Sequence, residues 1–398
     1  MGEYSARAVE RAMKIQEVIL RAISGQILWM QAAEIIGISD RGMRRWKQRY
    51  EEYGYDGLFD RRAKKPGPKK VPLADVEKVL RLYRERYFDL NVRHFVEKLH
   101  AEHKVSLSYT WVKTALQTAG LVTKSRKRGK HRKKRTRRPL PGMMLHVDGS
   151  THAWLGGKAR QDLVAILDDA TSEVYYAQLV DQESTATVMA GLKEVVEQKG
   201  AFCSLYSDRG SHFFYTPIAG GPPDRSRKTQ IARALEQLDI KAIPANSPQA
   251  RGRCERFFGT WQGRLPQELR LKGITTMAAA NEFLRKEWIP FHNQTFTVAA
   301  QQCGTAFVPY VGKDLKKIFS HQEERIVGND NTITFGKLSL QIEQQKFRFS
   351  MAKCRALVCQ HLDDTISVYY GPHLVGSYKA NGEPVGAECI SRRRKKAA

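Results

Sequence analysis

The sequence predicts a multidomain protein: N-terminal all-α helix-turn-helix units, a central α/β core on a mixed sheet, and a small all-β barrel. Two observations predict this order. Apolar residues recur at helical spacing through the first third of the chain. Later they fall in short strand-like runs, which first alternate with helices and then follow one another directly. With 398 residues, 41% of them hydrophobic, the chain is long enough for several domains with their own cores.

The charge of the chain favours a polyanionic partner. The formal net charge is +26, and the basic residues are concentrated in runs, which favours nucleic acid. No apolar stretch approaches the roughly 20 residues needed to span a bilayer, and the first residues lack a signal-peptide pattern, so no membrane partner is expected. The six cysteines show neither a disulfide framework nor zinc-site spacing. A reducing cytoplasm is the location that this cysteine usage favours.

Residues 1–60 have the layout of a helix-turn-helix DNA-binding domain. A helical rhythm over 8–23 is followed by an apolar segment, by the turn Gly37-Ile38-Ser39, and by a helix expected over 40–53. Ser39 is expected to cap this last helix. Its basic side chains are the DNA-contact candidates Arg41, Arg44, Arg45 and Lys47. An ordinary pair of surface-charged helices is the alternative.

A basic linker at 61–72, broken by proline and glycine, leads to a second helical unit at 73–122. Three helices are expected in this unit. The last of them presents a second set of DNA-contact candidates, Tyr109, Trp111 and Lys113. Trp111 can equally belong to the core of the unit.

A basic arm is expected at 123–141, before the core. No acidic residue occurs between Glu102 and Asp148, and positions 124–138 hold eleven lysines and arginines in fifteen residues. Like charges at this density do not fold alone and favour an extended segment that follows DNA phosphates. The candidate contacts are Arg126, Lys127, Arg128, Arg132, Lys133, Lys134 and Arg135. A tract that serves nuclear localisation or solubility is the alternative.

Residues 142–300 predict an α/β layer structure with a mixed sheet. Three strands in meander come first, then helices and strands alternate, and a long helix carries Glu255. Asp148 and Asp208 would each end a strand at the same sheet edge, where open α/β sheets place their sites. Strands are expected at 143–148, 161–168, 173–181, 202–207 and 239–243, helices at 184–199 and 229–238, and an inserted loop at 209–228.

The remaining sequence predicts a connector at 301–330, a small all-β barrel at 331–390 and a basic tail at 391–398. Six short alternating runs separated by turn residues, one of them at 347–350, predict this barrel, with a curled sheet as the alternative.

Asp148, Asp208 and Glu255 are the candidate catalytic residues. Three carboxylates make an oxygen-rich cage for divalent metal, and Mg2+ prefers carboxylate oxygens. Two ions roughly 3.5–4 Å apart can activate an attacking hydroxyl and stabilise the leaving oxygen when a phosphodiester is broken or joined. Asp168 and Asp169 also follow a strand, but a turn-capping role before Ala-Thr-Ser explains them more simply.

Side chains near these acids are further candidates for DNA contact. Arg251 and Arg253 stand just before Glu255, at the start of its helix. His152 and Trp154 follow Asp148 closely enough to position the strand that is cut. They could equally pack the meander, and both interpretations stay open.

Four segments carry a resemblance to a known family. They are Asp148-Gly149-Ser150-Thr151-His152-Ala153-Trp154, Leu167-Asp168-Asp169-Ala170-Thr171-Ser172, Ser207-Asp208-Arg209-Gly210, and residues 246–256 around Glu255. In this order they resemble the integrase-core transposases of bacterial insertion sequences, most closely the ISNCY-type group, whose cores have the ribonuclease-H-like fold. The resemblance covers nearly the whole chain, including the helix-turn-helix.

The resemblance implies a DDE triad at Asp148, Asp208 and Glu255, with Mg2+ or Mn2+ as cofactor and two ions expected. It implies a DNA transposase that binds terminal inverted repeats, cleaves the element ends and transfers them to target DNA. The implied partners are double-stranded DNA and further copies of the chain, as a dimer or higher oligomer in a synaptic complex. Two alternatives are a DNA-binding regulator with an inactive core and a structure-specific nuclease of the same fold.

Overall fold

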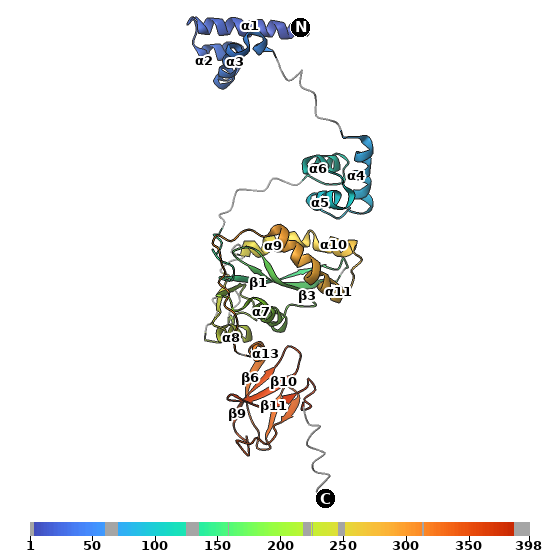
Figure 1. Cartoon of the computed structure of the whole chain (residues 1–398), viewed down its shortest axis with the longest axis vertical. Helices are drawn as coiled ribbons and strands as arrows, with labels where there is room; N and C mark the ends of the chain where they lie inside the picture. The colour runs from blue at the N-terminus through green and yellow to red at the C-terminus, as the bar shows by residue number, and fades with distance from the viewer. Residues whose placement is uncertain are drawn as a thin grey trace. The chain divides into compact units, whose positions relative to one another are not determined.

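The computed structural model describes residues 4–59, 71–124, 135–157, 159–217, 224, 226–245, 251–312 and 314–385. The chain divides into two compact units, Met1–Lys78 and Val79–Ala398. Figure 1 labels their helices and strands. No helix in the described part of the chain combines the length and the apolar character needed to cross a membrane.

The first unit contains the predicted helix-turn-helix. Its helices are α1 (Ala6–Ile23), α2 (Trp29–Ile36) and α3 (Asp40–Tyr53), followed by the 3-10 turn η1 (Gly54–Leu58). Gly37 ends α2 in the left-handed conformation with φ of 76°, and the Ser39 hydroxyl accepts a hydrogen bond from the Gly42 amide, as predicted for the cap of α3. Ile19, Ala32 and Met43, one from each helix, are buried in a common core.

The second helical unit is formed by α4 (Leu73–Glu85), α5 (Val92–His103) and α6 (Tyr109–Thr118). Phe95, Leu99 and Leu116 are fully buried at its centre, and Trp111 packs against this cluster. Asn91 and Ser108 cap α5 and α6 with their side chains. The core alternative for Trp111 is therefore the one that its packing supports.

The core is a five-stranded mixed sheet in the order β3-β2-β1-β4-β5. Its strands are β1 (Leu145–His152), β2 (Gln161–Asp168), β3 (Val174–Val180), β4 (Ser204–Ser207) and β5 (Lys241–Pro244). The first three are antiparallel neighbours, whereas β4 runs parallel to β1 and β5 runs parallel to β4. The predicted meander followed by alternating helices and strands is confirmed.

One predicted strand end is wrong. Asp148 lies in the middle of β1, because residues 149–152 continue the ladder and pair with 161–164 of β2. Asp208 does follow its strand directly, as predicted.

The alternation of side chains along the strands divides the core into two layers. Leu145, Val147 and Ile166 face the helix α7 (Thr185–Lys199) in one apolar cluster. Leu163 and Ala165 face the opposite way, toward α9 (Gly252–Gln262). Figure 1 shows α7 and α9 on opposite sides of the sheet. Since Asp148 pairs in register with Ala165, it lies on the α9 face.

The remaining helices complete these layers. The helix of Glu255 was expected to be long, but α9 ends at Gln262 and separate helices follow. They are α8 (Gln230–Gln237), α10 (Leu265–Leu271), α11 (Met277–Phe283), the π-helical turn η4 (Leu284–Trp288), α12 (Ile289–Phe296) and α13 (Leu315–Ile318).

The C-terminal part is all-β, but the predicted closed barrel is wrong. Four antiparallel strands form an open sheet in the order β11-β10-β9-β6, and β7 and β8 form a separate hairpin. Within the described residues no ladder joins β6 to β11, so the sheet does not close. The strands are β6 (His321–Ile326), β7 (Thr332–Phe335), β8 (Leu338–Gln341), β9 (Arg355–Gln360), β10 (Ile366–Tyr370) and β11 (His373–Tyr378).

Candidate active site

The parallel pairing of β1 with β4 brings two of the predicted acids together. His146 lies in register with Tyr206. Asp148 and Asp208 each stand two residues further along, so the same register places them side by side on one face. Asp148 is 8% exposed, whereas the Asp208 side chain is 41% exposed and its Oδ1 accepts a hydrogen bond from the Gly210 amide. One carboxylate is thus buried at the sheet and the other borders solvent.

A single guanidinium joins the two carboxylates. Arg251, the residue before α9, donates from Nη2 to Asp148 Oδ1 and from Nη1 to Asp208 Oδ2, the latter over 3.3 Å. The sequence predicts that Arg251 contacts DNA, but in the structure its charge is paired with the two acids. The space between the carboxylates therefore accepts a positive charge, which the guanidinium of Arg251 supplies in this structure.

Glu255 does not join the two aspartates in this structure. It is exposed in the first turn of α9, and its side chain pairs with no cation among the described residues. Across the same residues, no three acidic, histidine or cysteine side chains gather as a metal site would require. Glu255 nevertheless follows Arg251 by four residues, so the two side chains are neighbours on the helix surface.

The burial of Asp148 perturbs its titration. Burial raises the pKa of Asp148 to about 6, against the lowering effect of the Arg251 hydrogen bond and charge, and Asp208 and Glu183 raise it further. Because this pKa lies above that of an exposed carboxyl, ionising Asp148 costs folding stability as the pH rises through about 6. A buried acid held near a second acid is typical of functional sites.

The raised pKa predicts that metal binding at these aspartates depends on pH. A divalent ion needs the ionised carboxylate, so Mn2+ affinity should fall about tenfold for each pH unit below about 6 and change little above pH 7. Mn2+ titrations followed by electron paramagnetic resonance between pH 5 and 8 would measure this, with circular dichroism to confirm folding at each pH. Equal affinity at pH 5 and pH 7 would contradict the assignment.

Sequence reasoning missed a second acid near Asp148. Glu183, between β3 and α7, accepts a hydrogen bond at Oε1 from His212 Nε2, with the two atoms 3.1 Å apart. Its other oxygen lies against Gly149, where a Cβ would be 1.9 Å away. The hydrogen bond to Glu183 raises the pKa of His212. The pair thus links the segment after Asp208 to the backbone after Asp148. In the sequence, only Gly149, in the first of the four segments that carry the family resemblance, pointed to this close contact.

A fully buried carboxylate, Asp169, connects the basic arm to the active-site helix. Asp169 Oδ1 contacts His146 Nε2 at 2.6 Å and also pairs with Arg135 and Arg253. Its Oδ2 accepts the Arg138 amide at 2.8 Å. The predicted turn-capping role is wrong for Asp169, whose partners come from other elements. It is confirmed for Asp168, which accepts hydrogen bonds from the Thr171 amide and hydroxyl.

The DNA-contact candidates of the core and arm have different outcomes. Arg253 is committed to Asp169 and to the Arg135 carbonyl, and its side chain is 14% exposed, so its charge is neutralised within the core. Arg135 also pairs with Asp169 but stays 40% exposed. The other arm candidates lie outside the described residues; they are Arg126, Lys127, Arg128, Arg132, Lys133 and Lys134.

The prediction that Trp154 contacts DNA is wrong. Trp154 is fully buried between β2 and α9, and its indole donates to the Ser150 carbonyl at 3.1 Å. His152 packs edge-on against the Trp154 ring and is partly exposed. The packing alternative therefore holds for Trp154, and DNA contact by His152 stays a prediction.

The DNA-contact candidates of the two helical units differ in their exposure to solvent. Arg41, Arg44 and Arg45 are exposed on α3, while Lys47 pairs with Glu51 and lies over the Trp29 ring. In α6, Tyr109 is exposed and Lys113 is partly buried beside it.

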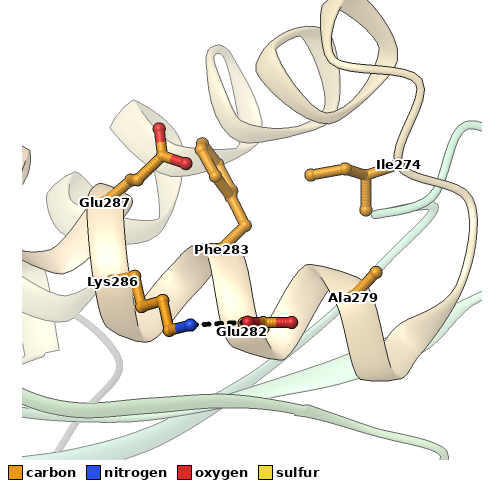
Figure 2. A pocket seen from close by; sticks show the side chains of 6 residues that line it. All are labelled: Ile274, Ala279, Glu282, Phe283, Lys286 and Glu287. Carbon is orange, nitrogen blue, oxygen red and sulfur yellow. Dashed lines mark hydrogen bonds and ion pairs between the residues drawn. The ribbon is translucent and has the colours of Figure 1, made fainter.

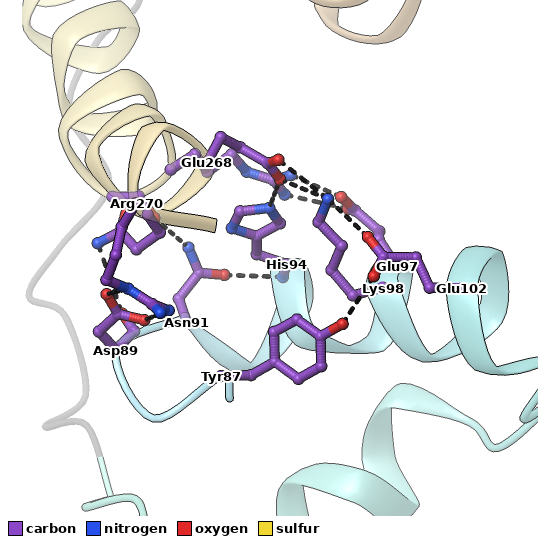
Figure 3. Close-up of polar contacts among 12 residues, drawn as sticks. Tyr87, Asp89, Asn91, His94, Glu97, Lys98, Glu102, Glu268 and Arg270 are labelled. Atoms are coloured by element: carbon purple, nitrogen blue, oxygen red, sulfur yellow. Dashed lines mark hydrogen bonds and ion pairs between the residues drawn. The ribbon is translucent and has the colours of Figure 1, made fainter. Parts of the chain in front are cut away.

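Polar contacts dock the second helical unit on the helix that follows α9. Glu268 of α10 is buried and contacts His94 Nε2 at 2.6 Å and Lys98 Nζ at 2.9 Å (Figure 3). Burial alone would raise the pKa of Glu268, but its hydrogen bonds to His94 and Lys98 lower it below the usual value. Arg270 adds a two-pronged ion pair with Asp89. The active-site layer and the second helical unit are therefore joined through α10.

Removing the Glu268 carboxylate is expected to weaken this docking. Glu268→Ala leaves His94 and Lys98 without their buried partner, which should cost about 2–4 kcal/mol in the free energy of unfolding. Urea denaturation and hydrogen exchange of α5 would measure the loss. Glu282→Ala, which breaks an exposed ion pair with Lys286, is the control and should leave both measurements unchanged. Equal behaviour of the two variants would refute the docking role.

A pocket elsewhere in the core contains none of the candidate catalytic residues Asp148, Asp208 and Glu255. It is lined by Ile274, Phe283 and Glu287 among others, and the Lys286–Glu282 ion pair closes one side (Figure 2). Its residues come from α11, η4 and the segment before them, so it is separate from the candidate active site.

The fold and the site define a class of protein: helix-turn-helix units joined to a mixed-sheet α/β core that brings two acids together. Family models support the N-terminal assignment, since a helix-turn-helix domain matches residues 16–67 and a homeodomain-like domain matches residues 43–116.

Two curated relatives give the family resemblance over most of the chain. A putative transposase, y4bF, of Sinorhizobium fredii is 29% identical over 85% of this chain and 74% of its own length. The transposase for insertion sequence IS1202 of Streptococcus pneumoniae is 25% identical over 88% of this chain and 82% of its own. The resemblance to insertion-sequence transposases is thus confirmed.

Among solved structures, the HTLV-2 integrase catalytic core domain in complex with magnesium aligns over 42% of this chain and 95% of its own. The sequence identity over this alignment is 14%, and the TM-score is 0.31.

Proposed function

We propose that this protein is a DNA transposase that cleaves the ends of an insertion sequence and joins them to target DNA, with Asp148, Asp208 and Glu255 as its catalytic residues. The observation that carries the proposal is the convergence of Asp148 and Asp208 on one cation, from neighbouring parallel strands of the mixed sheet. The two transposase relatives, similar over most of the chain, support the same function.

The donor set fits Mg2+ or Mn2+. Carboxylate oxygens are the ligands that Mg2+ prefers, and the single positive charge of Arg251 offsets only part of the charge of the two aspartates. Asp148 and Asp208 would hold one edge of the metal site, and Glu255 would complete it from α9. Arg251 would have to leave the aspartates first, and Glu255, four residues further along the chain, would then have to swing toward them. Bound there, divalent metal would supply Lewis acidity to the attacking and leaving oxygens.

Side chains of this protein would position the reacting groups. Asp148 is fixed by β1 and by burial, so its oxygens are held in place before DNA binds. Asp208 is more exposed, so a phosphodiester could reach its carboxylate from solvent. Arg251, once released, is a cation beside the reacting phosphate and can neutralise its charge. The Glu183–His212 contact holds the loop after Asp208 against β1.

Residues outside the acidic site would hold the DNA. The exposed arginines of α3 approach the major groove of the terminal repeat, and α6 contributes through Tyr109 and Lys113. Arg135 anchors the C-terminal end of the basic arm beside the site, so DNA that follows the arm is led toward the aspartates. Assembly into a dimer or higher oligomer would bring two element ends together.

Incubation of the purified chain with duplexes that carry candidate terminal repeats and Mg2+, followed by mapping of the products, tests the proposal. We expect cleaved 3′ ends that become joined to a second duplex. Cleaved products that never join would support a structure-specific nuclease of the same fold. Metal-independent binding with no cleavage of any end would support a regulator with an inactive core. Either result would overturn the transposase assignment.

A further inference from the structure

We propose that a turn in the C-terminal sheet is a stacking site for unpaired DNA bases. The turn comprises residues 345–349, between β8 and β9, and is called the aromatic turn below. Phe349 is 82% exposed and Phe347 is 50% exposed, although both are large apolar side chains. The proposal goes beyond the proposed transposase function, and only the choice of DNA over RNA rests on that function.

The aromatic turn is held in a fixed position. The Phe347 ring packs at a tilt against His373 at the start of β11, with ring centres 4.5 Å apart and an interplanar angle of 31°. Arg348 donates from Nη1 to the Tyr370 hydroxyl at 3.0 Å and from Nε to the Ser350 carbonyl at 2.8 Å. Gln345 donates to the Val375 carbonyl of β11. The exposed rings are therefore presented by a preorganised surface, which reduces the entropy lost on binding.

The charge around the turn favours a polyanion. No acidic residue occurs between Glu343 and Asp363, or between Asp364 and Glu383, and these segments supply the turn and the strands that support it. Their five cations are Lys346, Arg348, Lys353, Arg355 and Lys379. Among the residues that the structure describes, neither Lys346 nor Arg348 pairs with an acid. A protein partner with an ordinary apolar patch would not require this one-sided charge.

Alternating cations and exposed aromatic rings suit an unpaired strand better than a duplex. Base faces are covered by their neighbours within a duplex, whereas unpaired bases can stack on aromatic side chains while cations contact the backbone. Each such base contributes about 1–3 kcal/mol, which corresponds to about fivefold or more in affinity. Phe347 and Phe349 are the stacking residues, and Lys346 and Arg348 contact phosphates beside them.

The test uses the full chain in EDTA, so that binding is measured without cleavage. The probes are an unpaired oligonucleotide that contains 2-aminopurine, whose fluorescence falls on stacking, and a duplex of equal length. Phe347→Ala and Phe349→Ala should each weaken binding to the unpaired probe about fivefold or more, reduce the quenching, and leave duplex affinity within about twofold. Val311→Ala is the matched control, because Val311 is 87% exposed and lies outside the C-terminal sheet.

Three outcomes would overturn the proposal. Unchanged affinity and quenching in both phenylalanine variants would exclude stacking at the turn. An equal loss on the unpaired probe and the duplex would indicate a general effect on DNA binding. Altered sedimentation with unchanged DNA binding would make the turn a contact between copies of the chain. Phe349→Leu separates stacking from apolar contact, since leucine should bind as weakly as alanine. Circular dichroism of each variant confirms that the sheet is folded.

Discussion

Asp148→Asn is expected to abolish strand transfer while DNA binding persists. The substitution keeps the shape of the side chain but removes the charge that the proposed metal site needs. Metal-assisted stabilisation of the reacting oxygens is worth several kcal/mol, so joining should fall by about a thousandfold or more. Strand transfer in a gel assay with labelled element ends would measure the loss, and a mobility-shift assay would measure binding.

The control for this experiment is Asp181→Asn. Asp181 is an exposed acid just after β3, on the same sheet, and it should retain wild-type joining. Joining activity within tenfold of wild type in Asp148→Asn would remove Asp148 from the catalytic residues. A parallel loss of DNA binding would instead mean that the variant is misfolded, and circular dichroism would detect that.

The largest effect on stability is expected from Asp169→Asn. The substitution leaves Arg253 and Arg135 without the buried negative charge that they share, and it weakens the contact with His146. Breaking a buried ionic cluster in this way costs about 3–5 kcal/mol. Urea denaturation followed by tryptophan fluorescence is the measurement, since Trp154 and Trp261 are buried in the same layer.

The same cluster predicts how stability responds to acid. Burial would raise the pKa of Asp169, but its hydrogen bonds to His146 and the Arg138 amide and the charge of Arg253 lower it well below the usual range. Its stabilising effect is therefore present above about pH 4 and lost as the pH falls further. Asp169→Asn should lack this acid-dependent component. A loss below about 1 kcal/mol in Asp169→Asn at pH 7 would show that the cluster does not stabilise the core.

Local patterns predicted elements well where a continuous apolar run is buried and failed where charged or exposed residues form the element. The strand β2 was predicted with its observed bounds, because its apolar run is bounded by polar residues. The strand β6 was missed because it is an edge strand rich in charged residues, which protect an edge from pairing. Residues 347–350 alternate like a strand, yet they belong to a turn whose exposed phenylalanines the alternation could not distinguish from buried ones.

The candidate site was predictable only in part, because its remaining contacts join distant residues. The two strand patterns placed Asp148 and Asp208 on neighbouring strands, although Asp148 lies within β1 and not at its end as the edge rule required. The partners of Asp169 lie 34 and 84 residues away, and nothing in the local sequence distinguishes its role from a turn cap. The bridge formed by Arg251 likewise spans 103 residues to Asp148. Such pairings depend on tertiary register, which no short motif encodes.

The central claim is that Glu255 joins Asp148 and Asp208 around divalent metal once DNA is bound. The most direct measurement is Mn2+ binding, followed by electron paramagnetic resonance, to the wild-type chain and to Glu255→Gln, each with and without terminal-repeat DNA. We expect the two proteins to bind Mn2+ alike without DNA, and only the wild type to gain a second ion or about tenfold in affinity when DNA is added. An equal gain in Glu255→Gln would contradict the account.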